Sequence, residues 1–267
     1  MMEEKIAKFI QFTLLPGWGV VSQNRLLRMC GSIESCYEKD LTDLLQLDEK
    51  RKGGRIGEAK LRTFAENRCD DIFQEEAERI VTDCRKKNIQ IITADDEEYP
   101  KCLKDLPDMP VVLYVAGALK INDFISSIGL VGARRCTQED KQKAIEKVEA
   151  EVKNRTVIIS GMAKGIDSYA HTAALMNNGY TIAVLGNGPD ICYPKEHETL
   201  YEEIKNQGCI LSEYRPGIAP HRYLFPQRNR LIAALSDELY VIGAGRRSGT
   251  DSTVESGERY GRVINRI

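Results

Sequence analysis

The sequence predicts an α/β protein: an extended Rossmann-like, doubly wound and mostly parallel sheet, preceded by a small all-helical domain of the helix-hairpin-helix or SAM-like type. From Ile125 onward, short apolar runs alternate with helical stretches, which is typical of a parallel sheet covered by helices. The first 65 or so residues show helical apolar spacing instead, as in "IAKFIQFTLL". We therefore expect a helical domain over residues 1–85 and a Rossmann-like domain over residues 86–267.

The helical region contains a turn, "PGWGVV", in which Gly17 and Gly19 allow the backbone to reverse tightly. The pattern resembles a helix-hairpin-helix, a motif whose hairpin amides can hold a DNA phosphate, and "GRIGEAKLRTF" is a weaker second copy. Residues 1–100 carry 16 basic and 20 acidic residues. We therefore favour a compact helical bundle over direct DNA contact here. "DDIFQEEAERIVTDCRKKN" predicts an amphipathic helix that links the two domains.

The second region predicts strands and helices in alternation. "IQIIT" and "VVLYVAG" are two strands around a proline-rich connection. Later strands are expected at "ISSIGLVGARR", "TVIISG", "YTIAVLGNG", "CILSEY" and "ELYVIGAG", with helices between them and a last helix at "GTDSTVESGERYG". Ligands of such sheets bind at the carboxyl ends of the strands. We therefore expect the functional residues in the loops that follow these strands.

The first such loop, "VGARRC", combines Gly132 with Arg134 at the start of a helix. Backbone amides, the helix dipole and a guanidinium can together hold a phosphate there. An ordinary strand-to-helix turn is the plainer interpretation, because the pattern is short.

The second loop, "SGMAKGID", has an anion-binding character. Its amides and the Lys164 ammonium form a plausible anion cradle. Asp167 either caps the helix or orients its neighbours, and His171, on the same helix face, either touches a ligand or is structural. The candidate residues of this loop are Gly161, Met162, Lys164, Gly165 and Asp167.

The third loop, "LGNGPDICYPKEH", places Tyr193 two residues before Lys195. An aromatic ring beside a lysine suits stacking on a nucleobase with a phosphate contact. Packing of Tyr193 over the sheet edge is an equally open alternative.

The remaining two loops bring arginines and small residues to the same edge. Phe225 precedes a helix start that carries three polar residues, Arg228, Asn229 and Arg230. The helix dipole disfavours cations there, so the pattern indicates either a bound anion or an internal carboxylate partner such as Glu213. The last loop contributes Ser248, Gly249 and Thr250, a turn that favours phosphate.

Composition excludes several classes of protein. Eight cysteines form no CxxC pair and there are three histidines, so we expect neither a zinc site nor any other metal or cofactor. No signal peptide and no membrane-spanning run is present, which favours a cytoplasmic location. Beyond Lys205 every basic residue is an arginine, a side chain suited to phosphate, although a solvated surface is the plainer explanation: Arg215, Arg222, Arg228, Arg230, Arg246, Arg247, Arg259, Arg262 and Arg266.

Six segments in order, "VGARR", "SGMAKGIDSYAHTAAL", "AVLGNGPDICYP", "LSEYRPG", "FPQRNRLIAALS" and "SGTDSTVESG", closely resemble the bacterial DNA-processing protein A family over about residues 100–263. The resemblance implies a core that binds single-stranded DNA without sequence preference. It also implies a non-catalytic homodimer that loads the RecA recombinase in natural transformation. The family's pocket arginine falls on Arg134, its glycine-rich phosphate turn on residues 161–167, and its Arg-Asn-Arg segment on residues 228–230.

The chain departs from this family pattern after its last helix. Family members continue into a strand that ends in Pro-Gly, and many carry a winged-helix domain, whereas this sequence ends in "GRVINRI". We therefore expect a shortened last strand and no winged helix.

A nucleotide-processing enzyme, similar to nucleoside monophosphate phosphoribohydrolases, is the alternative. Those enzymes carry Gly-Thr-x-x-Glu, whereas Glu255 comes five residues after Thr250, which puts the carboxylate on another helix face and removes the general acid or base. The sequence also contains no GxGxxG and no GxxxxGK[ST], so neither a dehydrogenase nor an ATPase is favoured. A pure interaction scaffold does not explain so many glycines and arginines at one edge. We therefore predict a DNA-binding protein rather than an enzyme.

Overall fold

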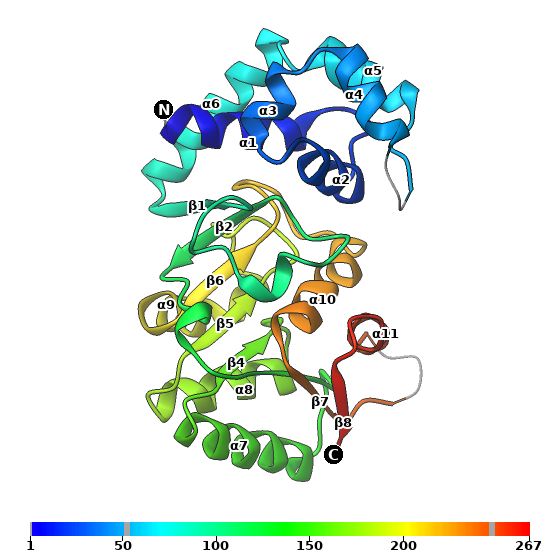
Figure 1. Cartoon of the computed structure of the whole chain (residues 1–267). Helices are drawn as coiled ribbons and strands as arrows, with labels where there is room; N and C mark the ends of the chain where they lie inside the picture. Colours follow the sequence, from blue (N-terminus) through cyan, green and yellow to red (C-terminus); the bar gives the residue numbers. More distant parts are fainter. Residues whose placement is uncertain (1, 51–53, 246–248) are drawn as a thin grey trace. The chain divides into compact units, whose positions relative to one another are not determined.

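The computed structural model describes residues 2–50, 54–245 and 249–267 of the chain (Figure 1). The chain divides into two compact units. The first comprises Met1–Tyr99 with Pro107–Leu113, and the second comprises Pro100–Leu106 with Tyr114–Ile267. The domain boundary expected between residues 85 and 86 stays a prediction.

The first unit is built mainly from helices, as its apolar spacing predicts. Its interior holds an aromatic cluster in which Phe12, Trp18 and Phe64 lie with their ring centroids 5.5–5.6 Å apart. Gly17 has a φ of +74° in the turn before the second helix, a conformation that glycine adopts without strain. The helices are α1 (Met2–Leu14), α2 (Val20–Cys30), α3 (Ile33–Glu38), α4 (Leu41–Glu49), α5 (Glu58–Asn67) and α6 (Asp71–Lys86).

The strands of the chain form one eight-stranded sheet in the order β1-β2-β6-β5-β4-β3-β7-β8. β2 pairs with β6 in antiparallel fashion, and the six strands from β6 to β8 are parallel to one another. The prediction of a helical region followed in the chain by an α/β domain with a mostly parallel sheet is therefore confirmed. The strands are β1 (Ile89–Thr93), β2 (Val112–Gly117), β3 (Ser127–Gly132), β4 (Val157–Ser160), β5 (Thr181–Val184), β6 (Cys209–Ser212), β7 (Glu238–Ile242) and β8 (Val263–Arg266).

Helices cover both faces of the parallel part of the sheet (Figure 1). α7 (Gln138–Lys153), α8 (Ile166–Met176) and α9 (Glu198–Gln207) pack side by side on one face. α10 (Leu224–Leu235) and α11 (Asp251–Arg259) pack together on the other. The chain leaves β3 toward β4 and later returns to β7 on the other side of β3, so the order of strands reverses there. Ligands bind in the crevice that such a reversal opens.

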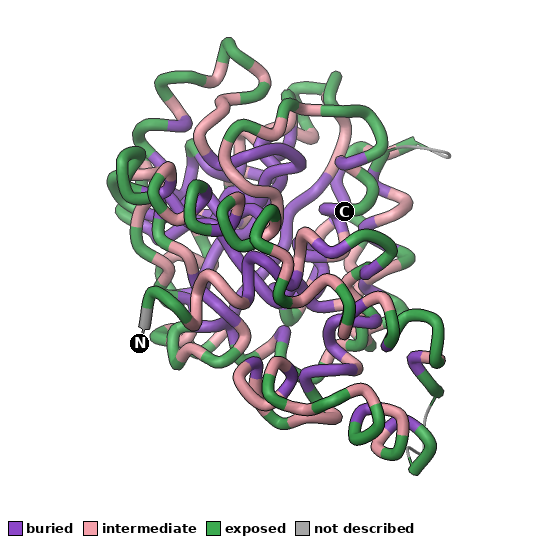
Figure 2. Tube along the Cα trace, turned by 90° about the horizontal axis from the view of Figure 1, so that it is seen from above, coloured by how far each residue is buried: buried purple, intermediate pink, exposed green. Residues whose placement is uncertain are grey.

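The strands from β3 to β8 lie in the second unit and contribute to its core. All residues of β4, β5 and β6 are buried, and Ile128, Leu130 and Ile158 pack against Ala144 and Ile166 of the covering helices. In Figure 2 the buried stretches run through the interior and the exposed ones lie on outer turns. The apolar strand runs that suggested a sheet covered on both faces are explained by this burial.

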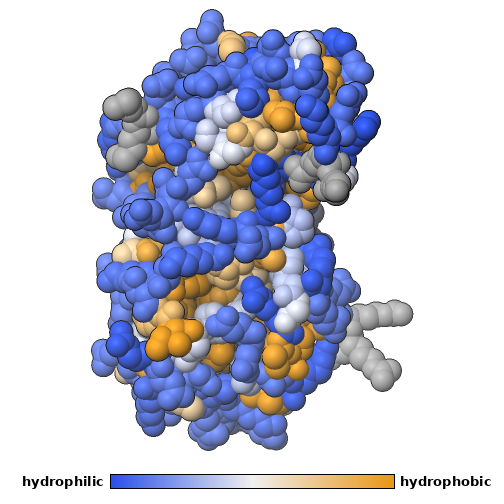
Figure 3. Space-filling view, viewed as in Figure 1, coloured by the Kyte–Doolittle hydropathy of each residue, from blue (hydrophilic) through white to orange (hydrophobic). Residues whose placement is uncertain are grey.

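The face of the molecule drawn in Figure 3 is largely hydrophilic. Among the described residues, no helix has both the length and the apolar character needed to cross a membrane.

A last strand forms at the edge of the sheet. Val263–Arg266 are β8, which runs parallel to β7 with Val241 opposite Arg266.

Candidate functional site

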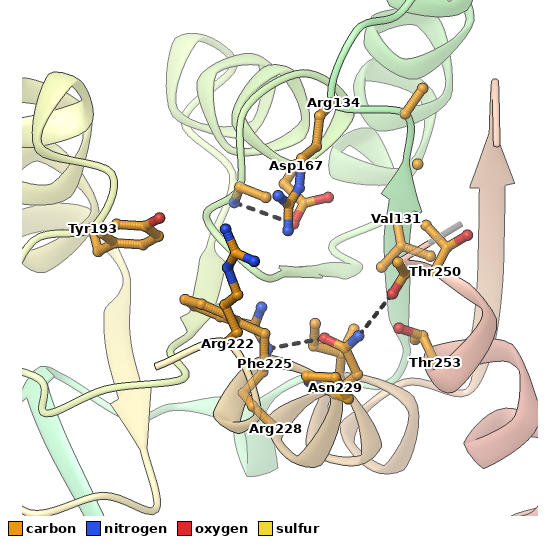
Figure 4. Close-up of a pocket in the computed structure, with 16 residues that line it drawn as sticks. Val131, Arg134, Asp167, Tyr193, Arg222, Phe225, Arg228, Asn229, Thr250 and Thr253 are labelled. Carbon is orange, nitrogen blue, oxygen red and sulfur yellow. Dashed lines mark hydrogen bonds between the residues drawn. The ribbon is translucent and has the colours of Figure 1, made fainter. Parts of the chain in front are cut away.

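A pocket with a volume of about 640 Å³ lies at the carboxyl ends of β3 and β7, where the strand order reverses (Figure 4). We call it the strand-edge pocket. Its wall consists of residues 131–134 at the end of β3 and just after it, Ala163 and Asp167 after β4, and Tyr193 after β5. Six residues from Arg222 to Ile232, before and within α10, and three from Gly249 to Thr253, before and within α11, complete it. Its volume lies within the range of small-molecule and cofactor sites.

Two exposed arginines reach into this pocket from different loops, Arg134 after β3 and Arg222 before α10 (Figure 4). Neither guanidinium forms an ion pair with any carboxylate in the described part of the chain. Both are therefore available to an anionic ligand. Our sequence interpretation selected Arg134 and missed Arg222, because Arg222 lies in an irregular loop where no helical or strand period marks the face that a side chain takes.

The glycine-rich turn after β4 binds the protein's own carboxylate. The amides of Gly161 and Ala163 donate to Asp167 Oδ2 at 3.1 and 3.3 Å. Burial raises the pKa of Asp167, while the nearby charge of Arg228 acts in the opposite direction. Asp167 therefore holds the turn in place, which is the orienting role that we considered for it, and these two amides point inward.

Met162 and Gly165 shape the same turn without lining the pocket. Met162 is fully buried with a φ of +63°, and Gly165 has a φ of +81°. A Cβ on Gly165 would lie 2.2 Å from the carbonyl oxygen of Ala133, and the next amide, that of Ile166, donates to this oxygen. Gly165 thus lets the turn approach the loop after β3.

The two lysines of the candidate set lie at the rim. Lys164 Nζ forms an ion pair with Glu196 at 2.6 Å, and both side chains are about half exposed. Lys164 lines a second, smaller pocket of about 90 Å³, which shares Arg134 and Tyr193 with the strand-edge pocket. Lys195 is exposed on the short 3₁₀ helix η3 (Lys195–His197) and lines neither pocket.

Arg228 is a buried residue that connects two strand ends. Arg228 is only 4% exposed, and its guanidinium donates to the carbonyl oxygens of Gly161 (2.9 Å) and Val184. Its Nε donates to Asn229 Oδ1 at 3.1 Å. Burial lowers the pKa of Arg228 to about 10, so the group stays charged at neutral pH. Arg228 therefore organises the pocket wall.

The neighbours of Arg228 on α10 face different surroundings. Asn229 lines the pocket and donates to Gly249 O (3.1 Å) and Ser252 Oγ (2.9 Å), which ties α10 to the start of α11. Arg230 points elsewhere and pairs with Glu213 at 2.5 Å, with both side chains mostly buried. Of our two explanations for the arginines at this helix start, the internal carboxylate partner is confirmed for Arg230.

Gly249, Gly132 and Ser248 complete the candidate set. Gly249 and Gly132 line the pocket from opposite loops. A Cβ on Gly132 would lie 2.2 Å from the carbonyl oxygen of Ile242, so the close approach here is between β3 and β7. Ser248 lies outside the described residues.

An aromatic pair forms one side of the strand-edge pocket. The rings of Tyr193 and Phe225 stack with centroids 5.5 Å apart and an interplanar angle of 26°. Phe225 in turn lies against Gly186, where a Cβ would come within 2.8 Å of the ring. Tyr193 remains 47% exposed. It therefore packs over the sheet edge, as one alternative expected, while part of its ring stays exposed; stacking on a nucleobase stays a prediction.

His171 has a structural role. It is fully buried, its Nδ1–H donates to Thr181 Oγ1 at 2.7 Å, and that hydroxyl donates to Ile158 O. Burial lowers the pKa of His171 to about 3. The imidazole is therefore neutral and does not line the pocket. Across the described ranges, no group of three or more His, Cys, Asp or Glu residues is placed to hold a metal ion.

Comparison with known proteins points to one family. A family model described as DNA recombination-mediator protein A matches residues 90–267. DNA processing protein DprA of Streptococcus pneumoniae is 44% identical over 169 residues, which are 63% of this chain and 59% of that protein. Protein Smf of Synechocystis sp. is 41% identical over 183 residues, 67% of this chain and 46% of that protein. The chain thus spans about half the length of the curated relatives it matches.

Solved structures agree with these matches. The X-ray structure of DNA processing protein A from Streptococcus pneumoniae superposes with a TM-score of 0.76 at 32% identity, over all of this chain and 86% of that one. DNA processing protein A from Helicobacter pylori, described for its single-stranded DNA binding mode, gives a TM-score of 0.61 at 33% identity. That match covers 67% of this chain and 81% of that one.

Proposed function

The chain belongs to the DNA recombination-mediator protein A family, and from that premise we propose that it binds single-stranded DNA at the strand-edge pocket without sequence preference. The observation that carries the proposal is the pair of exposed arginines, Arg134 and Arg222, that enter this pocket without a carboxylate partner among the described residues. Guanidinium groups bind phosphate oxygens through paired hydrogen bonds. A DNA strand carries one phosphate per nucleotide, so it can offer a phosphate to each of the two guanidinium groups.

The aromatic wall supports a single strand over a duplex. The exposed face of Tyr193, backed by Phe225, is a stacking surface for an unpaired base. Base–aromatic stacking contributes about 1–3 kcal/mol per base and accepts every base, because each has a π face. In a duplex these faces are covered by neighbouring base pairs.

The polar groups of the pocket support binding without base readout. The amide of Asn229 is the group best suited to recognise a base edge. However, its Nδ2 donates to Gly249 O and Ser252 Oγ, and its Oδ1 accepts from Arg228. It is therefore committed within the protein, and the remaining attraction comes from charge and stacking.

We propose further that the bound strand is passed to the RecA recombinase, and that the protein acts as a cytoplasmic homodimer without catalysing a reaction. Among the described residues, Asp167 is the one carboxylate that lines the pocket, and turn amides hold it. Glu255, which the hydrolase alternative needs, is exposed and lies outside the pocket. The pocket thus offers no free general base, and the alternative of a nucleotide-processing enzyme gains no support.

Fluorescence anisotropy of a labelled oligo-dT tests the binding proposal at several salt concentrations, with a duplex of equal length for comparison. We expect tight single-strand binding that weakens steeply with salt. Replacing both Arg134 and Arg222 by alanine should weaken binding at least about tenfold, because charge-assisted hydrogen bonds are lost. The salt dependence should also become shallower, by about 0.7 for each phosphate contact removed.

Arg155→Ala is the matched control, since this exposed arginine precedes β4 at the amino end of the sheet. It removes one positive charge far from the pocket, as each single replacement in the double variant does inside it, and should leave affinity nearly unchanged. Equal affinities for the double variant and the wild type would refute the proposal. RecA filament growth on strands with and without bound protein then tests the transfer step.

A further inference from the structure

We propose that Glu196 competes with the DNA strand for Lys164 and so lowers the affinity of the site for single-stranded DNA. The inference rests on the proposed function and concerns a residue that the binding proposal does not use. It predicts an acidic side chain whose removal improves binding, which is the opposite of what removal of a ligand-binding residue does.

The carboxylate of Glu196 occupies the place where a phosphate would meet Lys164. Glu196 Oε1 lies 2.6 Å from Lys164 Nζ. The same ammonium lines the small pocket of about 90 Å³ together with Arg134 and Tyr193. When a phosphate approaches these groups, the charge of Lys164 is therefore already neutralised by Glu196, and the Glu196 carboxylate repels the phosphate.

The segment that carries Glu196 is anchored to the turn that carries Lys164. The neighbouring His197 donates from Nδ1 to the carbonyl oxygen of Met162 at 3.1 Å. Its backbone amide donates to Pro194 O at 3.0 Å, which closes the 3₁₀ turn. The contact between His197 and Met162 therefore holds the two segments together beside the ion pair, which reduces the entropy that an ordinary surface pair loses.

The expected effect is modest because the pair is not buried. The side chains of Lys164 and Glu196 are 54% and 57% exposed. Exposed ion pairs are weak, so a phosphate can displace Glu196. We expect Glu196→Gln to bind oligo-dT about two- to fivefold more tightly than the wild type, the range that such a pair allows.

The structure offers a close control on the neighbouring helix α9. Glu202 pairs with Lys205 at 2.9 Å, its side chain is 55% exposed, and neither residue lines the two pockets. Glu202→Gln removes the same charge from an ion pair of the same kind. A general change in the field of the protein would affect both variants alike, whereas competition at Lys164 predicts tighter binding for Glu196→Gln alone.

A double-mutant cycle identifies the group through which Glu196 acts. In a Lys164→Met background, Glu196→Gln should give no further gain, because the cation for which it competes is absent. The inference is overturned if Glu196→Gln binds no better than Glu202→Gln, or if its gain persists in the Lys164→Met background. If the wild type itself fails to bind oligo-dT, the proposed function fails; a wild type that binds while Glu196→Gln shows no gain refutes this inference alone.

Discussion

Replacement of Arg228 by methionine separates the organisation of the pocket from ligand binding. Arg228 donates to the carbonyl oxygens of Gly161 and Val184 and to Asn229 Oδ1, and it is almost fully buried. Methionine keeps much of the volume and removes the charge and every donor. The three acceptors then lose their bonds, and the buried carboxylate of Asp167 loses the nearby positive charge that favours its ionised form.

The magnitude follows from the burial of these groups. Removal of one partner from a buried charged network lowers stability by about 3–5 kcal/mol, because the remaining partners stay buried without compensation. That range already includes the desolvation energy that is recovered when the guanidinium is no longer buried. We therefore expect Arg228→Met to lower the free energy of unfolding of the second unit by about 3–5 kcal/mol at pH 7.

Urea unfolding followed by circular dichroism measures this loss, with Arg222→Met as the comparison. Arg222 is exposed and lines the same pocket, so its replacement should change stability by less than about 0.5 kcal/mol but weaken oligo-dT binding in anisotropy. The two arginines should thus behave in opposite ways. If Arg228→Met is as stable as Arg222→Met, the organising role of Arg228 is wrong.

Three further outcomes are expected. Gly165→Ala should lower stability by about 1–3 kcal/mol in thermal or urea unfolding, because its φ of +81° disfavours a side chain and its Cβ has no space; Gly19→Ala, with open space and a φ of −82°, should change little. Burial lowers the pKa of His171 from 6.5 to about 3 in the folded protein, so as the pH decreases the unfolded chain binds a proton before the folded one does, and stability falls. This group alone should lower the free energy of unfolding by about 2 kcal/mol between pH 7 and pH 5. The stability of His171→Gln should depend correspondingly less on pH. Tyr193→Ala should weaken oligo-dT binding by about 1–3 kcal/mol in anisotropy while Tyr193→Phe keeps most of it, and equal losses in both variants would argue against stacking.

The fold was predictable because strand runs and helix periods alternate clearly from Ile125 onward. The strands expected at "IQIIT" and "CILSEY" form at Ile89–Thr93 and Cys209–Ser212. A parallel sheet then places every loop that follows a strand at one edge. This is why Arg134, Tyr193 and Phe225, which are far apart in the sequence, lie around one pocket.

The direction of individual side chains was not predictable. Arg228 and Arg230 are two residues apart on α10, so a helical rotation of about 100° per residue separates them, and the sequence does not say which one faces the sheet. Only packing shows that Arg228 enters the core and Arg230 meets Glu213. Likewise, the pairing of Lys164 with Glu196 depends on where two different loops meet.

The position of β3 between β4 and β7 has a consequence for the growing polypeptide on the ribosome. β3 pairs with β4, which is synthesised soon after it, but its other edge pairs with β7, which emerges only after β4, β5 and β6 with their helices. Throughout that interval, the nascent chain carries an apolar strand with an open row of amides and carbonyls, which is a template for pairing with other chains. This edge of β3 therefore stays without its native partner until β7 has been synthesised.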